Sequence, residues 1–311
     1  MARRRRGLPV NGVLLFDKPH GLSSNHALQR VRRLFQAQKA GHTGTLDPMA
    51  TGLLPILFGE ATKFSSHLLE ADKVYRARIK LGEVTDTGDA EGQVIERLPV
   101  PRFGEAELGE VLERFRGEIE QVPPMYSALK HQGRPLYELA RQGKTIERAV
   151  RRVRVYDTRL LSHDGDGFEL EVSCSKGTYI RTLAEDIGRD LGCGAHITAL
   201  RRLETGPFAG DEMQTLEALQ ALSDQAAREA LLLPVDVLVT HLPSIAVDEA
   251  QASRLLHGQP AGVDTRGLAD DSLARLYRDE AFLGLVTVKA TGEIAPRRLL
   301  DTSVAQAGGG V

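Results

Sequence analysis

The stretch from Gly41 to Gly52 (GHTGTLDPMATG) constrains this chain most, because its glycines and proline restrict the backbone in specific ways. Gly41, Gly44 and Gly52 permit backbone angles that other residues avoid, and they let a ligand approach the main chain closely. Pro48 disfavours the α region for Asp47, so we expect its carboxylate to stand on rigid, extended backbone. A fixed carboxylate beside open backbone suits a nucleophile or a general base. A plain turn with a capping aspartate is the alternative.

The composition is that of an ordinary globular protein. The 311 residues are 41% apolar and 26% charged, which favours two domains or one large domain with an appendage. No apolar run approaches the ~18 residues of a membrane-spanning helix. The basic segment Met1–Arg6 lacks the apolar stretch of a signal peptide. The two cysteines form no C-x-x-C pair and the nine histidines show no metal-ligand spacing. We therefore expect a cytoplasmic protein with free thiols and without a metal, a cofactor or a membrane partner.

Charge is distributed unevenly along the chain. From Asp211 onward there are 15 acidic and 8 basic residues, a balance of −7; the total net charge is −2, so the first 210 residues carry +5. A one-sided basic patch lies within them, opposed only by Glu138 and Glu147: Lys130, Arg134, Arg141, Lys144, Arg148, Arg151, Arg152 and Arg154. This excess favours a polyanionic partner, and a solvated helix face is the alternative.

The N-terminal third predicts short strands and helices around the Gly41–Gly52 loop. Val13–Phe16 is a short apolar strand, and Ser23 or Ser24 then caps a helix with one apolar face. That face carries Leu28, Val31, Leu34 and Phe35, whereas the basic residues point toward the loop: Arg30, Arg32, Arg33 and Lys39. After the loop, Leu53–Phe58 is predicted as a buried strand and residues 61–69 as a helix.

The middle of the chain predicts a strand, an acidic turn and an extended segment. From Lys73 to Leu81 apolar and basic residues alternate, so Tyr75 lies at the start of a strand on its apolar face, where a rim position in the core is the alternative to a cleft. The acidic turn from Thr85 to Gly92 resembles a calcium loop only superficially. The paired prolines of residues 121–128 require extended backbone.

Arg181 breaks a local rule of helix chemistry. Thr178 is expected to cap a helix whose core stripe begins at Ile180, which puts Arg181 in the first turn. A cation there opposes the helix dipole by a few tenths to ~1 kcal/mol. Pairing with a buried aspartate resolves the conflict, and Asp47 is the candidate; Asp186, one turn later, is the alternative.

The C-terminal third predicts a change of architecture. A helical acidic segment occupies residues 215–232, and the main body closes near Asp236. Beyond Pro243 the pattern gives a short strand, a helix from Asp248 to Leu256, and further short strands. We expect a separate β-rich unit of about sixty residues there.

Six sequence blocks resemble the bacterial tRNA pseudouridine synthase B family, in that family's order. The central block Gly41–Gly52 is highly specific, and the match runs from about Val10 to Asp236. The other blocks are these: Phe16–Ser24, Tyr75 with Leu81 to Thr87, Pro123–Lys130, Gly177–Arg181, and the segment around Leu200, Arg201 and Arg202. The C-terminal unit resembles a PUA domain, by position and size.

The resemblance implies an α+β fold: a mixed, mostly antiparallel sheet flanked by helices, with an inserted basic thumb and a small PUA-like domain. We expect a basic tail at 1–8, a catalytic domain at 9–238 with the thumb at about 122–154, a PUA-like RNA-binding domain at 241–304, and a flexible tail at 305–311. The implied activity is conversion of uridine 55 in the tRNA T-loop to pseudouridine, without a cofactor or metal.

The resemblance also assigns roles to residues. Asp47 is the expected nucleophile, Arg181 pairs with it, and the base or its neighbours contact His42, Tyr75, Tyr179 and Leu200. Tyr75 is a proton acceptor only if something lowers its pKa. The basic residues expected to bind RNA are Lys18, Arg30, Arg33, Lys130, Arg141 and Arg152.

Three questions stay open from the sequence. The first is the reaction route: the carboxylate forms an adduct at C1′, forms an adduct at C6, or acts as a base in a route through a glycal. A tRNA-folding chaperone that uses the same surface is the alternative function. A guide-RNA-dependent synthase is a third, disfavoured by the thumb-like insert, so we expect tRNA as the partner and no obligate protein or guide RNA.

Overall fold

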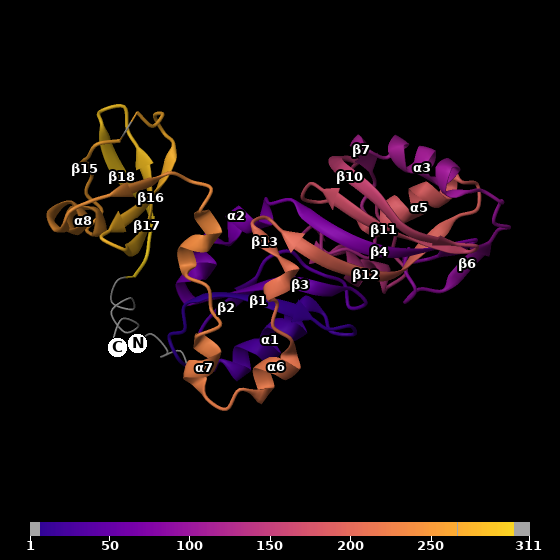
Figure 1. The fold of residues 1–311 in the computed structure, drawn as a ribbon, viewed down its shortest axis with the longest axis horizontal. Helices are drawn as coiled ribbons and strands as arrows, with labels where there is room; N and C mark the ends of the chain where they lie inside the picture. Colours follow the sequence, from indigo (N-terminus) through magenta and orange to yellow (C-terminus); the bar gives the residue numbers. More distant parts are fainter. Residues whose placement is uncertain (1–6, 266, 302–311) are drawn as a thin grey trace.

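The computed structural model describes residues 7–265 and 267–301. A nine-stranded sheet forms the main body, and a five-stranded sheet forms the C-terminal unit, which stands to one side of it (Figure 1). The strands of the large sheet are β1 (Gly12–Lys18), β2 (Ala40–His42), β3 (Thr51–Phe58), β4 (Lys73–Leu81), β7 (Gly117–Gln121), β10 (Arg151–Asp164), β11 (Gly167–Cys174), β12 (Ala195–Thr205) and β13 (Phe208–Ala209). The two further pairs of strands are β5 (Glu83–Thr85) with β6 (Val94–Arg97), and β8 (Lys130–His131) with β9 (Arg134–Pro135).

The order of the large sheet is β1-β3-β12-β4-β11-β10-β7, with β2 on β3 and β13 on β12. Only the β3–β12 pair is parallel among its described pairings. That pair brings the end of the Gly41–Gly52 loop beside β12, a segment about 150 residues away in the chain. The predicted mixed, mostly antiparallel sheet is confirmed.

Helices cover the sheet. The α-helices are α1 (Ser24–Leu34), α2 (Ser65–Leu69), α3 (Glu105–Arg114), α4 (Leu136–Ala140), α5 (Ile180–Asp190), α6 (Leu216–Ala221), α7 (Gln225–Glu229) and α8 (Glu249–Leu256). Within residues 7–265 and 267–301, the short 3-10 helices are η1 (Gly59–Phe64), η2 (Gly210–Glu212) and η3 (Val235–Val239). Among the described residues, no helix is both long and apolar enough to cross a membrane.

Local patterns predicted most of these elements. Strand β4 spans Lys73–Leu81 as predicted, with Ala77, Ile79 and Leu81 buried on one face. Two helix predictions were too simple: residues 61–69 form η1 followed by α2, and residues 215–232 form α6 and α7, because Asp224 caps a second helix. The Thr178 cap was wrong, since Tyr179 occupies the N-cap position and the Thr178 hydroxyl donates to the Ser175 carbonyl.

Two apolar cores lie on opposite faces of the large sheet. One packs α1, α3, α5 and α6 against it, with Val31, Leu108 and Leu183 fully or almost fully buried. The other packs η1, α2 and η3 against the β1–β3 end, and Leu285 of the C-terminal unit contributes to it. A ring contact between Phe64 and Phe282, 5.7 Å apart, lies at the same junction. The C-terminal unit therefore packs on the main body through apolar side chains.

The C-terminal sheet has the order β14-β16-β17-β18-β15 and its own core. Its strands are β14 (Ser244–Ala246), β15 (Ala261–Gly262), β16 (Leu273–Arg278), β17 (Ala281–Val288) and β18 (Glu293–Leu299). The expected helix is present as α8, and Asp248 caps it through a hydrogen bond from the Gln251 N–H. This small β-rich unit fits the expected PUA-like domain.

The thumb leaves the sheet between β7 and β10 and contains β8, β9 and α4. Since β10 begins at Arg151, the last residues of the expected 122–154 insert belong to the sheet. At the N-terminus, Gly7 and Leu8 were expected in the tail. Leu8 N donates to the Gln36 carbonyl at 2.7 Å, so the tail prediction extends two residues too far. Residues 1–6 and 305–311 lie outside the described residues.

Candidate active site

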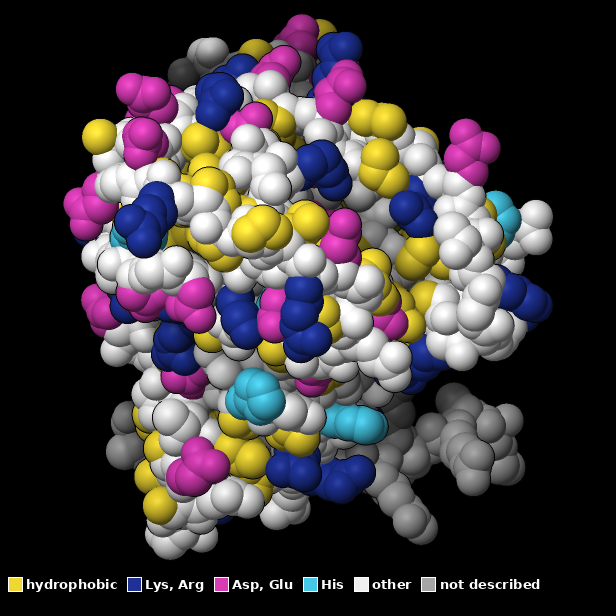
Figure 2. All heavy atoms as spheres, turned by 90° about the vertical axis from the view of Figure 1, so that its right-hand side faces the viewer, with side chains coloured by type: hydrophobic (Ala, Val, Ile, Leu, Met, Phe, Trp, Pro, Cys, Tyr) yellow, Lys and Arg dark blue, Asp and Glu magenta, His cyan; other side chains and the backbone are white. Residues whose placement is uncertain are grey.

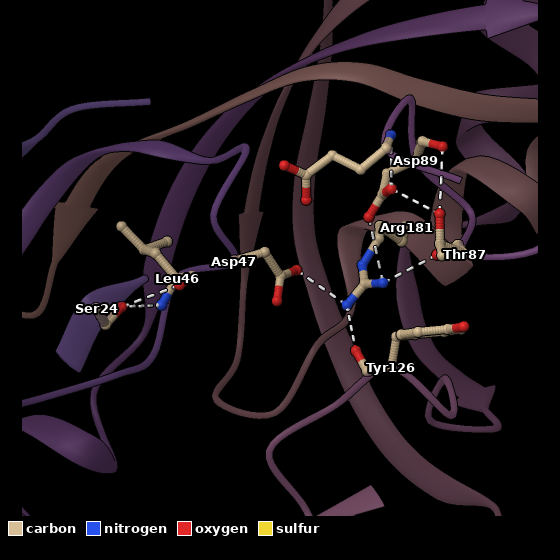
Figure 3. Close-up of polar contacts among 8 residues, drawn as sticks. Ser24, Leu46, Asp47, Thr87, Asp89, Tyr126 and Arg181 are labelled. Atoms are coloured by element: carbon tan, nitrogen blue, oxygen red, sulfur yellow. Dashed lines mark hydrogen bonds and ion pairs between the residues drawn. The ribbon is translucent and has the colours of Figure 1, made fainter. Parts of the chain in front are cut away.

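Asp47 is fixed by anchors on both of its neighbours. The Ser24 hydroxyl at the start of α1 donates to the Leu46 carbonyl (3.0 Å) and accepts from the Leu46 N–H (2.8 Å), as Figure 3 shows. On the other side, the Gly21 N–H donates to the Pro48 carbonyl at 2.8 Å. The Asp47 side chain nevertheless keeps 36% of its surface exposed. The loop thus holds an accessible carboxylate on an immobilised backbone.

Arg181 lies at the centre of the site and is 4% exposed. Its Nη2 lies 2.9 Å from Asp47 Oδ2 and donates to the Tyr126 carbonyl at 2.6 Å (Figure 3). Its Nη1 donates to the Thr87 carbonyl at 2.9 Å and lies 3.3 Å from Asp89 Oδ2. The expected proximity of Asp47 and Arg181 is therefore present. Two carboxylates and two carbonyls offset the unfavourable placement of this cation in a first helical turn.

The ionisation of Asp47 reflects opposing influences. Burial raises the pKa of the Asp47 carboxyl, and Asp89 acts in the same direction. Arg181, by charge and by hydrogen bonding, and Lys18, by charge, act to lower that pKa. Without Arg181, desolvation and a second nearby carboxylate would both favour the neutral acid, which does not attack.

Asp89 is one of two residues near Asp47 that the sequence left unidentified. Its side chain is 5% exposed, and it accepts from the Thr87 hydroxyl at 2.6 Å and from the Glu91 N–H at 3.1 Å. Asp86, three residues earlier, is exposed and instead accepts from the Gln93 N–H. The acidic turn was visible in the sequence, but nothing local distinguishes its two aspartates. The second ionic partner of Arg181 was therefore missed.

Arg202 was also missed, although it belongs to a block that matched the family. It is 1% exposed on β12, and it donates to the Leu53 carbonyl at 2.7 Å and the Gly44 carbonyl at 3.0 Å. Nothing in the local sequence distinguishes the buried Arg202 from the adjacent Arg201. Its contacts link β12 to both ends of the segment that carries Asp47.

The side chains expected to contact the base differ in their exposure. His42, Tyr75 and Tyr179 are half-buried, whereas Leu200 is only 8% exposed. Burial, with a contribution from Arg202, lowers the pKa of the His42 imidazole, so the ring is neutral near pH 7. This leaves a flat, uncharged ring available for stacking.

Tyr75 does not have the ionisation that a proton acceptor needs. Burial raises the pKa of the Tyr75 hydroxyl, an effect that the nearby Arg202 only partly counters. The condition set for a basic role was a lowered pKa, and the raised pKa of the Tyr75 hydroxyl does not meet it. Burial likewise raises the pKa of the Tyr179 hydroxyl.

Lys18 was expected to bind RNA, and the structure contradicts this. The residue is 0% exposed, and its ammonium donates to the carbonyls of Pro19 (2.9 Å), Leu22 (2.6 Å) and Pro48 (3.2 Å). Burial lowers the pKa of Lys18 to about 8. The side chain therefore braces the backbone next to Asp47 instead of reaching phosphate.

The remaining basic residues fall into two groups. Arg30, Arg33, Lys130 and Arg141 are exposed, as phosphate contacts require. Arg152 is also exposed, but it lies opposite Glu120 of β7 in the sheet register, with Arg152 Nε 3.4 Å from Glu120 Oε1. Arg154 pairs with Glu118 in the same way. Figure 2, which faces the end of the molecule that carries β6 and α3, shows acidic and basic side chains intermixed. The patch is less one-sided than the sequence suggested.

A cavity of about 730 Å³ lies between the thumb and α5. Thr87 and Tyr126, whose carbonyls accept from Arg181, line it together with Lys144, Thr182 and Glu185, but Asp47 does not. The arginine that contacts the candidate nucleophile thus also contacts the wall of this cavity. Among the described residues, no group of three or more His, Cys, Asp and Glu side chains is arranged to hold a metal ion.

Comparison with known proteins agrees with this geometry. The chain matches the family model of the TruB family pseudouridylate synthase N-terminal domain over residues 32–180, the tRNA pseudouridylate synthase B C-terminal domain over 181–240, and the pseudouridine synthase II TruB C-terminal segment over 243–300. It is 70% identical to a tRNA pseudouridine synthase B of Chromohalobacter salexigens, over 97% of this chain and 98% of that protein.

Two further comparisons extend the likeness. A tRNA pseudouridine synthase B of Chromobacterium violaceum is 54% identical over 94% of this chain and 95% of its own length. The crystal structure of a Cbf5-Nop10-Gar1 complex contains a chain with a TM-score of 0.68 and 26% identity, covering 93% of this chain and 84% of that one. From the three family models, the relatives and the shared fold, the chain belongs to the TruB family of pseudouridylate synthases.

Proposed function

We propose that this protein isomerises uridine 55 in the T-loop of tRNA to pseudouridine, with Asp47 as the attacking carboxylate. The observation that carries the proposal is the accessible Asp47 carboxylate 2.9 Å from the buried Arg181, in a chain whose relatives are named tRNA pseudouridine synthase B. Arg181 keeps the carboxylate anionic against desolvation and aims it.

The reaction is an isomerisation, so atoms balance within the substrate. The C1′–N1 bond breaks, the uracil turns, C1′ bonds to C5, the C5 proton leaves and N1 gains a proton. The target base is stacked inside a folded loop and is flipped out at a cost of a few kcal/mol. Stacking on an aromatic ring offsets ~1–3 kcal/mol per base, a role that suits Tyr75, Tyr179 or His42.

We propose that the two domains have the functions expected from the sequence. Residues 9–238 carry the chemistry, and residues 241–304 form a PUA-like domain that adds RNA contacts. Arg30, Arg33, Lys130 and Arg141 are exposed and contribute phosphate contacts, which makes binding fall steeply with salt. The protein acts in the cytoplasm, where its tRNA substrate is found.

We also propose that no guide RNA or protein partner is required. The relatives at 54–70% identity bear the name of a tRNA pseudouridine synthase alone, whereas the Cbf5 neighbour is part of a multiprotein complex. Activity of the purified chain on a bare T-arm hairpin supports this proposal, and a requirement for an added factor contradicts it.

The decisive experiment compares wild type with Asp47→Asn on a T-arm hairpin, with chemically tagged pseudouridine measured by mass spectrometry. We expect Asp47→Asn to bind the hairpin but to form no product. Asp86→Asn is the matched control, since Asp86 is exposed in a nearby turn, and it should retain activity. Product formed by Asp47→Asn at the wild-type rate would exclude Asp47 as the attacking group. A wild-type protein inactive on the hairpin would exclude the substrate.

A further inference from the structure

Arg202 occupies a position between the strands that frame the Asp47 loop. On β12 it lies opposite Gly52 of β3 in a parallel pair and opposite Tyr75 of β4 in an antiparallel pair. At 1% exposure its side chain does not reach the surface. It therefore acts on the site through neighbouring groups and does not touch the substrate.

The guanidinium spans the segment that carries Asp47. Its Nη2 donates to the Gly44 carbonyl at 3.0 Å, before Asp47, and its Nε donates to the Leu53 carbonyl at 2.7 Å, after it. Gly44 has φ +73°, and a Cβ there would lie 2.9 Å from Arg202 Nη1. The loop backbone thus approaches the guanidinium more closely than a larger residue allows.

Arg202 hydrogen-bonds two carbonyl oxygens and the Tyr75 side chain, and none of these partners is a carboxylate. No described aspartate or glutamate forms an ion pair with it. The adjacent Arg201, by contrast, makes a bidentate pair with Asp17 at 3.0 and 2.7 Å. Burying a cation without a counter-ion is costly, and local rules broken at such a cost are found mainly at functional sites.

The uncompensated charge acts on the candidate base-binding residues. The charge of Arg202 lowers the pKa of His42, and Arg202 counteracts the effect of burial on the pKa of Tyr75 both by its charge and by a side-chain hydrogen bond. When the C1′–N1 bond breaks, its electron pair passes to the uracil. A fixed cation in a water-poor site favours such developing negative charge.

We propose that Arg202 is a positioning residue for the isomerisation, which holds both ends of the Asp47 segment and supplies a fixed positive charge beside His42 and Tyr75. This inference rests on the proposed function. It assigns Arg202 two separable contributions, geometry and charge, which different substitutions remove.

The test uses the full chain and three measurements: single-turnover rate on a T-arm hairpin, dissociation constant for that hairpin, and an NMR titration of His42. We expect Arg202→Met to lower the rate on the order of 100-fold, as a misplacement of about 1 Å does, with the dissociation constant within threefold of wild type. The pKa of His42 rises in this variant because a nearby cation is gone. Arg202→Lys keeps the charge, so the His42 titration stays close to wild type while the rate remains reduced.

Arg201→Met is the matched control, because it removes an arginine from the same strand without touching Gly44 or Leu53. We expect a lower Tm and an unchanged rate. A folded Arg202→Met variant with a wild-type rate overturns the inference. A parallel loss of binding, rate and cooperative melting in both Arg202 variants also overturns it, because that result indicates a purely structural role. An inactive wild type refutes the proposed function instead, and the His42 titration then still tests the placement of the charge.

Discussion

Replacing Arg181 with methionine tests the electrostatic argument most directly. The substitution preserves an unbranched, helix-compatible side chain but removes the cation that Asp47 and Asp89 share, together with the hydrogen bonds to the Thr87 and Tyr126 carbonyls. Breaking a buried ion pair costs about 3–5 kcal/mol, because the remaining charge is left uncompensated. Asp47 is 36% exposed, so solvent screens its share, and we expect about 3 kcal/mol at pH 8.

This loss is measurable as a change in melting temperature. For a domain of this size each kcal/mol lowers Tm by about 2–4 °C, so we expect a decrease of about 6–12 °C at pH 8. A carboxyl whose pKa is higher in the folded state than in the unfolded state stabilises the fold when protonated, and that stability is lost as pH rises through the folded pKa. Removing Arg181 raises the pKa of Asp47 further, since Arg181 is its main opposing influence. The Tm deficit is therefore largest at pH 8 and narrows as pH falls.

The single-turnover rate of isomerisation also depends on the ionisation of Asp47. Only anionic Asp47 attacks, so the acidic limb of the single-turnover rate lies above the ordinary aspartate range in wild type and moves to still higher pH in Arg181→Met. Arg189→Met is the control, because its exposed guanidinium pairs only with Asp186 on the same helix among the described residues. An acidic midpoint identical in wild type and Arg181→Met, or a Tm deficit independent of pH, would refute the reasoning.

Three further predictions concern the surroundings of the site. Gly52→Ala should unfold or severely destabilise the protein in thermal melts, since a Cβ at φ +97° would lie 2.2 Å from the Arg202 carbonyl oxygen. Lys18→Met should lower Tm yet leave the salt dependence of RNA binding unchanged, because the ammonium is buried; a shallower salt slope would contradict this. Glu120→Gln should strengthen T-arm binding at low salt by freeing Arg152, and equal affinity would show that Arg152 lies outside the RNA interface.

Features that depend on neighbouring residues were predictable. Alternation identified β4 and its buried face, and the spacing of apolar residues identified the core stripe of α5, because a strand or helix repeats its own geometry. The position of Arg181 in a first helical turn even indicated a distant carboxylate. The unfavourable interaction with the helix dipole is visible in the local sequence, whereas the carboxylate that offsets it comes from another segment.

Only the tertiary structure showed which residues that are distant in the sequence contact one another. Asp86 and Asp89 are equivalent in the sequence, and only the packing of their turn against α5 places Asp89 on Arg181. The register of β7 with β10 places Glu120 beside the exposed Arg152, and the fold buries the Lys18 ammonium under three carbonyls. A sequence shows how much charge a segment carries, but desolvation and ion pairing depend on three-dimensional neighbours, which come from segments as far apart as Arg201 and Asp17, 184 residues along the chain.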